Sequence, residues 1–153
     1  MARIHDLASL YGALADATRL RILGLLANGE VCVCHIHESL RLPQPTVSRH
    51  LAHLRRAGLV QTRRDGVWIH YRLAPPADQS ALAAFSAAIH AVGHAPATRT
   101  DQERLGERAN RKDTRRLLPI IQCCGVTPEL VHDAPSGPAA PGQPRGPDRE
   151  DRH

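Results

Sequence analysis

Four cysteines, arranged as two close pairs, are the residues of this 153-residue chain with the most distinctive chemistry. Cys32 and Cys34 are separated by one residue, and Cys123 and Cys124 are adjacent. Cysteine thiolates are soft ligands that select thiol-seeking ions. The sequence has no apolar run long enough to cross a bilayer and no signal-peptide pattern, so we expect a cytoplasmic protein. Because that compartment is reducing, metal binding or thiol redox chemistry is favoured over structural disulfides.

The spacing of the first cysteine pair predicts a strained site. We expect a short helix from Val31 or Cys32 to Leu40, and in a helix residues i and i+2 point about 200° apart. Cys32 and Cys34 would then hold one ion only if the helical turn distorts. Such a distortion would act on the segment that follows and would supply a switch. The alternative is that both are small apolar core residues, a common role of free cysteine.

A strongly basic stretch follows this pair. Residues 41–72 contain seven arginines and a single acidic residue, Asp65, so they carry more net positive charge than the +5 of the whole chain. Concentrated positive charge is typical of a protein that binds a polyanion, although it can also be only a solvated surface. The charge pattern therefore favours nucleic acid as a partner.

Apolar periodicity predicts a mainly helical fold with one β-hairpin. Helices are expected over residues 3–15, 17–27, about 31–40, 44–57 and about 78–92, and strands over 60–64 and 67–73. Asn28-Gly29 and Gly58 are helix-ending signals, and Asp65-Gly66 favours a tight hairpin turn. Helix, short helix, turn, helix and basic hairpin is the order of a winged helix-turn-helix, in which the second helix of the pair enters the major groove.

Polar side chains of the helix predicted at 44–57 and of the hairpin are suited to binding DNA. Residues near the start of that helix reach base edges, and those further along contact bases or phosphates. Arginines beside the hairpin turn reach phosphate or the minor groove. The candidate DNA-binding residues are Gln44, Thr46, Ser48, Arg49, His53, Arg63 and Arg64.

Several motifs occur in an order typical of one family. They are residues 16–23, 45–51, 54–60 and 63–66 and the Cys-Val-Cys sequence at 32–34. Together they strongly resemble the ArsR/SmtB family of metal-responsive repressors over about residues 3–94. The resemblance implies a homodimer, assembled through the first and last helices of this region, that binds an imperfect inverted repeat in operator DNA and releases it when metal binds. One departure is Pro43, where the family commonly has a serine that caps the recognition helix.

The resemblance makes arsenite the expected inducer, with antimonite as a close substitute. Trivalent arsenic favours three thiolates, and many arsenite sensors of the family have a third cysteine where this chain has His37. We expect one or both of Cys123 and Cys124 to complete the site, within one subunit or across the dimer, because the apolar residues 117–121 could dock the C-terminal segment on the domain. One alternative is that all four thiolates hold cadmium, lead or zinc. A second is that Cys123 and Cys124 form an arsenic site of their own. A third is that the cysteines act as an oxidisable switch.

A second candidate metal site lies on the last predicted helix. His90 and His94 are four residues apart and so share one face, which could hold zinc across a dimer with Asp78 as a companion. The zinc-binding version of the family has an Asp-x-His pair near the start of this helix, where this chain has Ser80. Surface histidines without a ligand are the alternative.

Composition divides the chain into three parts. We predict a DNA-binding and dimerisation domain at 1–94, an extension at 95–132 that carries Cys123 and Cys124, and a disordered Pro- and Gly-rich tail at 133–153. The sequence contains no glycine-rich phosphate loop and no nucleophile motif. We therefore predict a regulator and not an enzyme.

Overall fold

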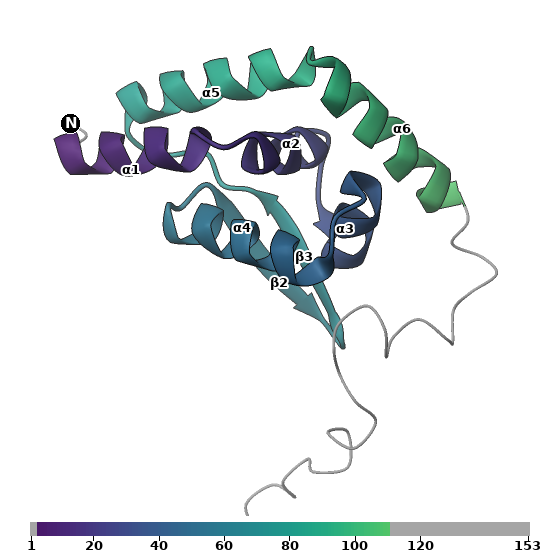
Figure 1. Ribbon diagram of the computed structural model, residues 1–153. Helices are drawn as coiled ribbons and strands as arrows, with labels where there is room; N and C mark the ends of the chain where they lie inside the picture. The colour runs from purple at the N-terminus through teal and green to yellow at the C-terminus, as the bar shows by residue number, and fades with distance from the viewer. Residues whose placement is uncertain (1–2, 111–153) are drawn as a thin grey trace, which may run out of the picture.

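The computed structural model of the protein describes residues 3–110, which fold into helices and one small sheet (Figure 1). In chain order the elements are α1 (Ile4–Leu14), α2 (Ala17–Leu26), β1 (Val31–Cys32), α3 (Val33–Leu40), α4 (Gln44–Arg56), β2 (Val60–Asp65), β3 (Trp68–Leu73), α5 (Gln79–Gly93) and α6 (Pro96–Asn110). The predicted winged helix-turn-helix is confirmed: α3 and α4 form the helix pair, and β2 and β3 form the wing.

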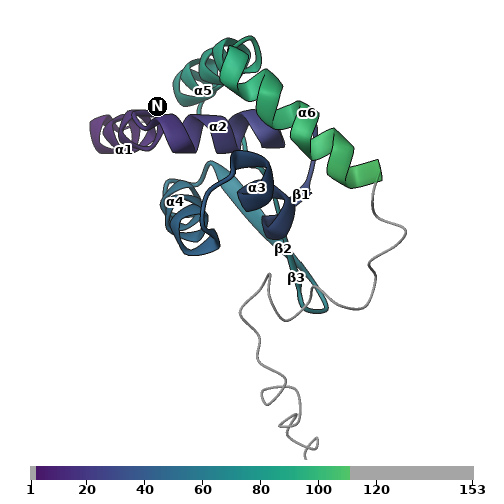
Figure 2. The same cartoon turned by 45° about the vertical axis from the view of Figure 1, so that its right-hand side comes forward.

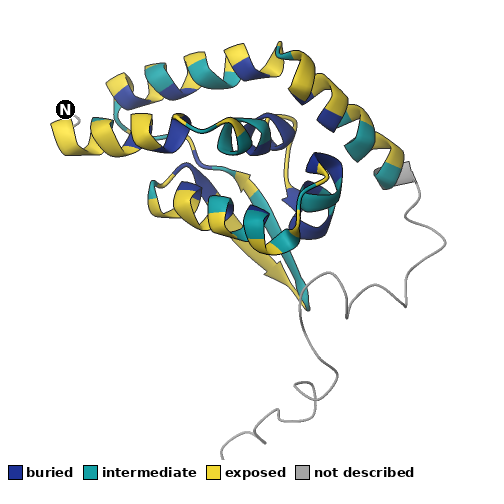
Figure 3. Cartoon of the chain, in the orientation of Figure 1, coloured by how far each residue is buried: buried dark blue, intermediate teal, exposed yellow. Residues whose placement is uncertain are grey.

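Three layers pack around a core made mostly of leucine and valine. α1 and α2 run through the middle, with α5 and α6 on one side and α3, α4 and the sheet on the other (Figure 1). Side chains such as Ile22, Leu51 and Leu54 have no exposed surface, and Figure 3 shows the buried positions on the inward faces of the helices. None of the described helices is both long and apolar enough to cross a membrane.

The turn between α3 and α4 is fixed by backbone geometry. Arg41 adopts a left-handed conformation (φ 55°, ψ 42°), and the N–H groups of Arg41 and Leu42 donate to carbonyl groups in the last turn of α3. Pro43 then precedes α4, whose first turn accepts Pro45 because that turn has no intrahelical N–H bond to lose. Proline thus begins the recognition helix without the side-chain cap that the family commonly uses.

The wing is an antiparallel hairpin that a third, very short strand extends. β2 and β3 pair from Val60 with Leu73 to Asp65 with Trp68, and Gly66 has a φ of 59° in the turn. β1 pairs with the other edge of β3, with Cys32 opposite His70. The expectation that the third helix begins at Val31 or Cys32 is therefore wrong: these two residues are extended, and the helix begins at Val33.

Helix α6 packs against α2 and α3 (Figure 2). Its Asp101 is fully buried and accepts two hydrogen bonds from the Arg21 guanidinium of α2, at 2.8 and 2.7 Å. Arg104 adds a contact to the same carboxylate and donates to the backbone oxygen of Ser39 in α3. The predicted boundary at residue 94 stays a prediction, as does the tail at 133–153, which lies outside the described residues.

The approach of α6 to α2 depends on Gly24. A Cβ atom at this position would lie 2.5 Å from Thr98 Cγ2 and 2.9 Å from Val92 Cγ1. We expect Gly24→Ala to lower the free energy of unfolding by about 1–2 kcal/mol, because the overpacking cost exceeds the better helix propensity of alanine. Urea unfolding at one protein concentration measures this change.

Gly106→Ala is the matched control for that substitution. Gly106 lies on α6 itself, and a Cβ atom there would meet nothing within 4 Å. This variant is expected to gain about 0.5–1 kcal/mol from helix propensity alone. Equal stabilisation by both substitutions would contradict the packing of α6 on α2.

Candidate DNA-binding surface and cysteine site

Helix α4 presents the predicted base-reading residues. Three side chains with no exposed surface fix the helix on the core: Val47, Leu51 and Leu54. The five predicted DNA-binding residues of α4 occupy its other faces, where Gln44, Thr46 and Ser48 are half-buried and Arg49 and His53 are exposed. The helix therefore has one apolar face that sets its position and a polar surface that DNA can reach, and the role of each residue stays a prediction.

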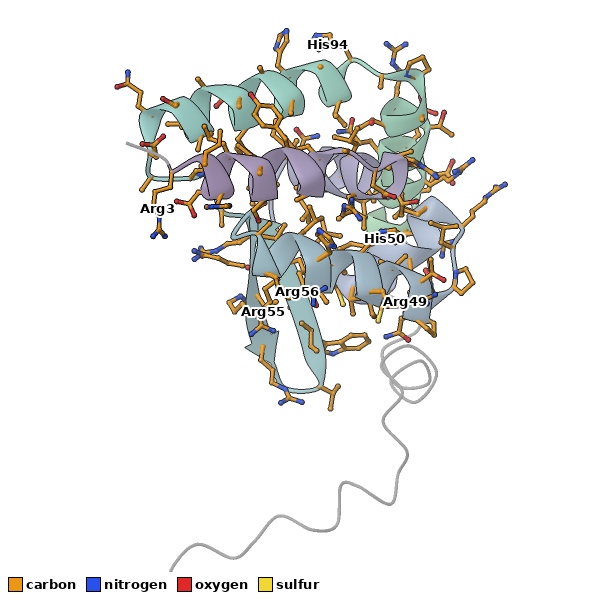
Figure 4. All side chains as sticks on the ribbon, turned by 60° about the vertical axis from the view of Figure 1, so that its left-hand side comes forward. Arg3, Arg49, His50, Arg55, Arg56 and His94 are labelled. Atoms are coloured by element: carbon orange, nitrogen blue, oxygen red, sulfur yellow. The ribbon has the colours of Figure 1, made fainter. Side chains whose placement is uncertain are left out.

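A basic pocket lies beside this polar surface. It is an open hollow of about 810 Å³, lined by Arg19, Arg49, His50, Ala52, His53, Arg55 and Arg56. Figure 4 shows Arg49 and His50 towards one end of α4 and Arg55 and Arg56 towards the other. Sequence reasoning had selected only Arg49 and His53. The repeated arginines of α4 were a usable signal for Arg55 and Arg56, whereas Arg19 comes from α2 and joins the pocket only through the fold.

Asp16 holds one wall of the basic pocket in place. Its carboxylate accepts the backbone N–H of Arg19 at 2.9 Å, which caps α2, and lies 3.4 Å from His50 Nδ1 of α4. The Arg19 backbone N–H is the main cause that lowers the pKa of Asp16. The Arg19 side chain in turn donates to the carbonyl oxygens of Ala13 and Gly12, at 2.7 and 2.9 Å. These contacts fix the guanidinium before any ligand binds.

The two wing arginines differ in their surroundings. Both Arg63 and Arg64 are exposed, as a phosphate contact requires. The Arg63 guanidinium, however, already binds the Glu30 carboxylate, with Nη2 2.6 Å and Nε 3.0 Å from Oε1. The hydrogen bonds from Arg63 lower the pKa of Glu30. Sequence reasoning did not anticipate this partner, which is 33 residues away along the chain.

The first cysteine pair straddles the junction between β1 and α3. Cys32 ends the strand and stands as the extended N-cap residue of the helix, and Cys34 is the second helical residue. Both side chains are buried, with 6% and 4% of their surface exposed. The expected geometry of two cysteines on one helical turn is therefore replaced by a strand-to-helix junction. Cys34 is disulfide-bonded in the structure, which departs from the expectation that disulfides are disfavoured in this chain. Burial itself is compatible with a guarded ligand site and equally with a role in the core.

Neither the cysteines nor the histidines form a complete metal site within residues 3–110. No cluster of three or more His, Cys, Asp or Glu side chains that could hold a metal occurs in that part of the chain. Cys123 and Cys124 lie outside the described residues, so the proposed third sulfur stays a prediction. His90 and His94 are exposed neighbours, with ring centroids 4.6 Å apart. Asp78 caps the opposite end of α5, about 18 Å along the helix axis from His90.

Comparison with known proteins agrees with this architecture. Residues 16–62 match the family described as "Bacterial regulatory protein, arsR family". The HTH-type transcriptional regulator MJ1325 of Methanocaldococcus jannaschii is 47% identical over 72 residues, which cover 46% of this chain and 81% of that protein. The chain belongs to the ArsR family. The structure of reduced HlyU from Vibrio cholerae is 32% identical with a TM-score of 0.50, covering 60% of this ArsR-family chain and 92% of HlyU.

A relative linked by its name to arsenic is also similar to this ArsR-family protein. The arsenic resistance transcriptional regulator ArsR1 of Pseudomonas putida is 49% identical over 71 residues, 46% of this chain. The match spans only 56% of that relative's own length. The family and these relatives are transcriptional regulators, which supports the prediction of a regulator over an enzyme.

The basic pocket and the start of α4 predict two distinguishable classes of DNA contact. Arg56→Ala is expected to weaken binding to all sequences alike and to lower the slope of log affinity against log salt by about one, as loss of one phosphate contact does. Thr46→Ala is expected to reduce discrimination between the cognate sequence and its single-base variants. Thr46 lies near the start of α4, where base edges are expected to be read. Fluorescence anisotropy on cognate and scrambled duplexes at several salt concentrations measures both effects.

Arg99→Ala provides the charge-matched control. Arg99 is an exposed residue of α6 that does not line the basic pocket. Its removal changes the net charge by the same amount as the loss of Arg56. Equal losses of affinity in the two variants would show that net charge, and not the pocket, determines binding.

Proposed function

We propose that this ArsR-family protein is a homodimeric repressor that holds operator DNA through α4 and the wing and releases it when arsenite binds Cys32 and Cys34. The observation that carries the proposal is the position of this pair. Cys32 ends the strand that pairs with the wing, and Cys34 lies in the first turn of the helix that leads into the recognition helix. An ion held by both sulfurs therefore acts on both DNA-contacting elements.

The chemistry of the pair suits trivalent arsenic. Cys34 is disulfide-bonded in the structure and must first be reduced by a dithiol or glutathione-type reductant. In the reduced protein each thiol can replace one hydroxyl group of arsenous acid, forming an As–S bond and releasing one water. Two cysteines supply two sulfurs, and we propose that Cys123 or Cys124 supplies a third. Cys32 is extended and Cys34 is helical, so both side chains must turn to reach one ion. Ligation therefore favours a rearranged form of the strand-to-helix junction. The name of ArsR1, an arsenic resistance regulator, supports this choice of inducer.

The proposed dimer uses the apolar surface of α1 and α5. Ile4 and Tyr11 of α1 are 74% and 58% exposed, and Leu82 of α5 is 37% exposed. These are the large apolar side chains with the greatest exposure in the described chain, and they lie on the two helices through which the family resemblance implies assembly. A second copy would remove this surface from water. A dimer also presents two recognition helices, as an inverted repeat requires.

Titration of the reduced protein on the DNA upstream of its own gene tests the proposal. Arsenite is expected to release wild-type protein, whereas Cys32→Ser and Cys34→Ser should each raise the arsenite concentration for half-release by roughly tenfold or more. Their affinity for DNA without arsenite should stay near the wild-type value, which serves as the folding control. Parallel titrations use antimonite, cadmium, lead, zinc and peroxide.

The outcomes separate the candidate functions. Release by peroxide alone would support a redox switch and overturn the arsenite proposal, and failure to bind the DNA at all would overturn the repressor proposal. Release by cadmium, lead or zinc but not arsenite would keep the repressor and change the inducer. A Cys123→Ser/Cys124→Ser variant with an unchanged arsenite response would show that the extension has no part in sensing.

A further inference from the structure

Glu30 connects the first cysteine pair with the wing. It immediately precedes β1, and its carboxylate binds Arg63 of β2 through three contacts: Nη2 to Oε1 at 2.6 Å, Nε to Oε1 at 3.0 Å and Nε to Oε2 at 3.3 Å. The two side chains are 27% and 53% exposed, so the pair stands at the protein surface where DNA can reach it. Asp65 lies 3.6 Å from Nη1 on the other side of the same guanidinium.

The position of Glu30 depends on the strand that carries Cys32. Val31 and Cys32 pair with Tyr71 and His70 of β3, so the backbone just after Glu30 is part of the wing sheet. His70, opposite Cys32, also lies 3.8 Å from Glu30 through its Nδ1 atom. A displacement of β1 relative to β3 therefore moves Glu30 relative to Arg63, which is held in register with His70 by the β2–β3 pairing.

The contact uses the part of Arg63 that phosphate would need. An arginine binds carboxylate and phosphate through the same planar fork of N–H groups. Glu30 occupies the Nε and Nη2 groups of that fork. A DNA phosphate that approaches Arg63 through these groups must displace the carboxylate, and it is also repelled by the negative charge of Glu30.

We propose that Glu30 competes with DNA phosphate for Arg63, and that the strand carrying Cys32 controls this competition. Glu30 is then a positioning residue that couples inducer binding to the wing, and this second part rests on the proposed function. The wing contributes its full phosphate contact only when Glu30 releases Arg63. The energy of the contact is modest, as for other exposed pairs, so the effect on DNA affinity is a several-fold adjustment.

Four variants without inducer test the competition: Glu30→Gln, Arg63→Gln, their double mutant and Asp65→Asn. Glu30→Gln is expected to bind the upstream DNA about threefold to tenfold more tightly and to steepen the salt dependence by about one phosphate contact. Arg63→Gln should bind more weakly, and adding Glu30→Gln to it should change nothing. The proposal would be overturned if Glu30→Gln did not bind the DNA more tightly. It would also be overturned if Glu30→Gln raised DNA affinity equally in the Arg63→Gln background.

The same proteins with arsenite test the coupling. Asp65→Asn removes an equal charge beside Arg63 but lies at the hairpin turn and not next to the cysteine strand, so its arsenite-driven release should match wild type. The fold-change in affinity caused by arsenite is expected to be smaller in Glu30→Gln than in Asp65→Asn. Equal responses would overturn the coupling. If arsenite fails to release wild-type protein, the proposed function fails, and the titrations without inducer decide whether Glu30 competes for Arg63.

Discussion

The pairing of two residues, Val31 and Cys32, with the wing strand β3 is the constraint on which the proposed function depends. It makes one sheet out of the cysteine segment and the wing hairpin. At Val33 the same chain becomes the helix that leads into the recognition helix. The backbone around Cys32 therefore connects directly to both halves of the candidate DNA-binding surface, and no long chain of intermediate side chains is needed to link them.

The other end of α3 is held from the opposite side of the molecule. Arg21 and Arg104 converge on the buried carboxylate of Asp101 and also donate to the backbone oxygens of Leu40 and Ser39. Arg108 of α6 adds an ion pair with Glu38. Helix α3 is thus joined to the sheet at its first residue and to α2 and α6 through its last three residues. A change at its start is therefore resisted at its end.

Local patterns were sufficient to predict the elements that have a clear period or a strong turn signal. The apolar spacing of α4 and the Asp65-Gly66 turn gave their positions within a few residues. A strand of two residues has no period, so β1 could not be separated from the helix that follows it. The docking of α6 depends on Asp101 and Arg21, which are 80 residues apart, in a segment with few apolar anchors. The Glu30 partner of Arg63 was equally invisible, because pairing across strands follows from the register of the sheet.

Burial of Cys32 and Cys34 has a kinetic consequence. Each residue exposes 6% or less of its surface, so local opening of the junction is expected to be the main route by which an ion reaches the sulfurs. Under the proposed function, the opening frequency limits how fast the protein responds to a rise in inducer, while affinity sets only the final occupancy. The proposed sensor would then respond slowly but select against reagents too large to enter the opened junction.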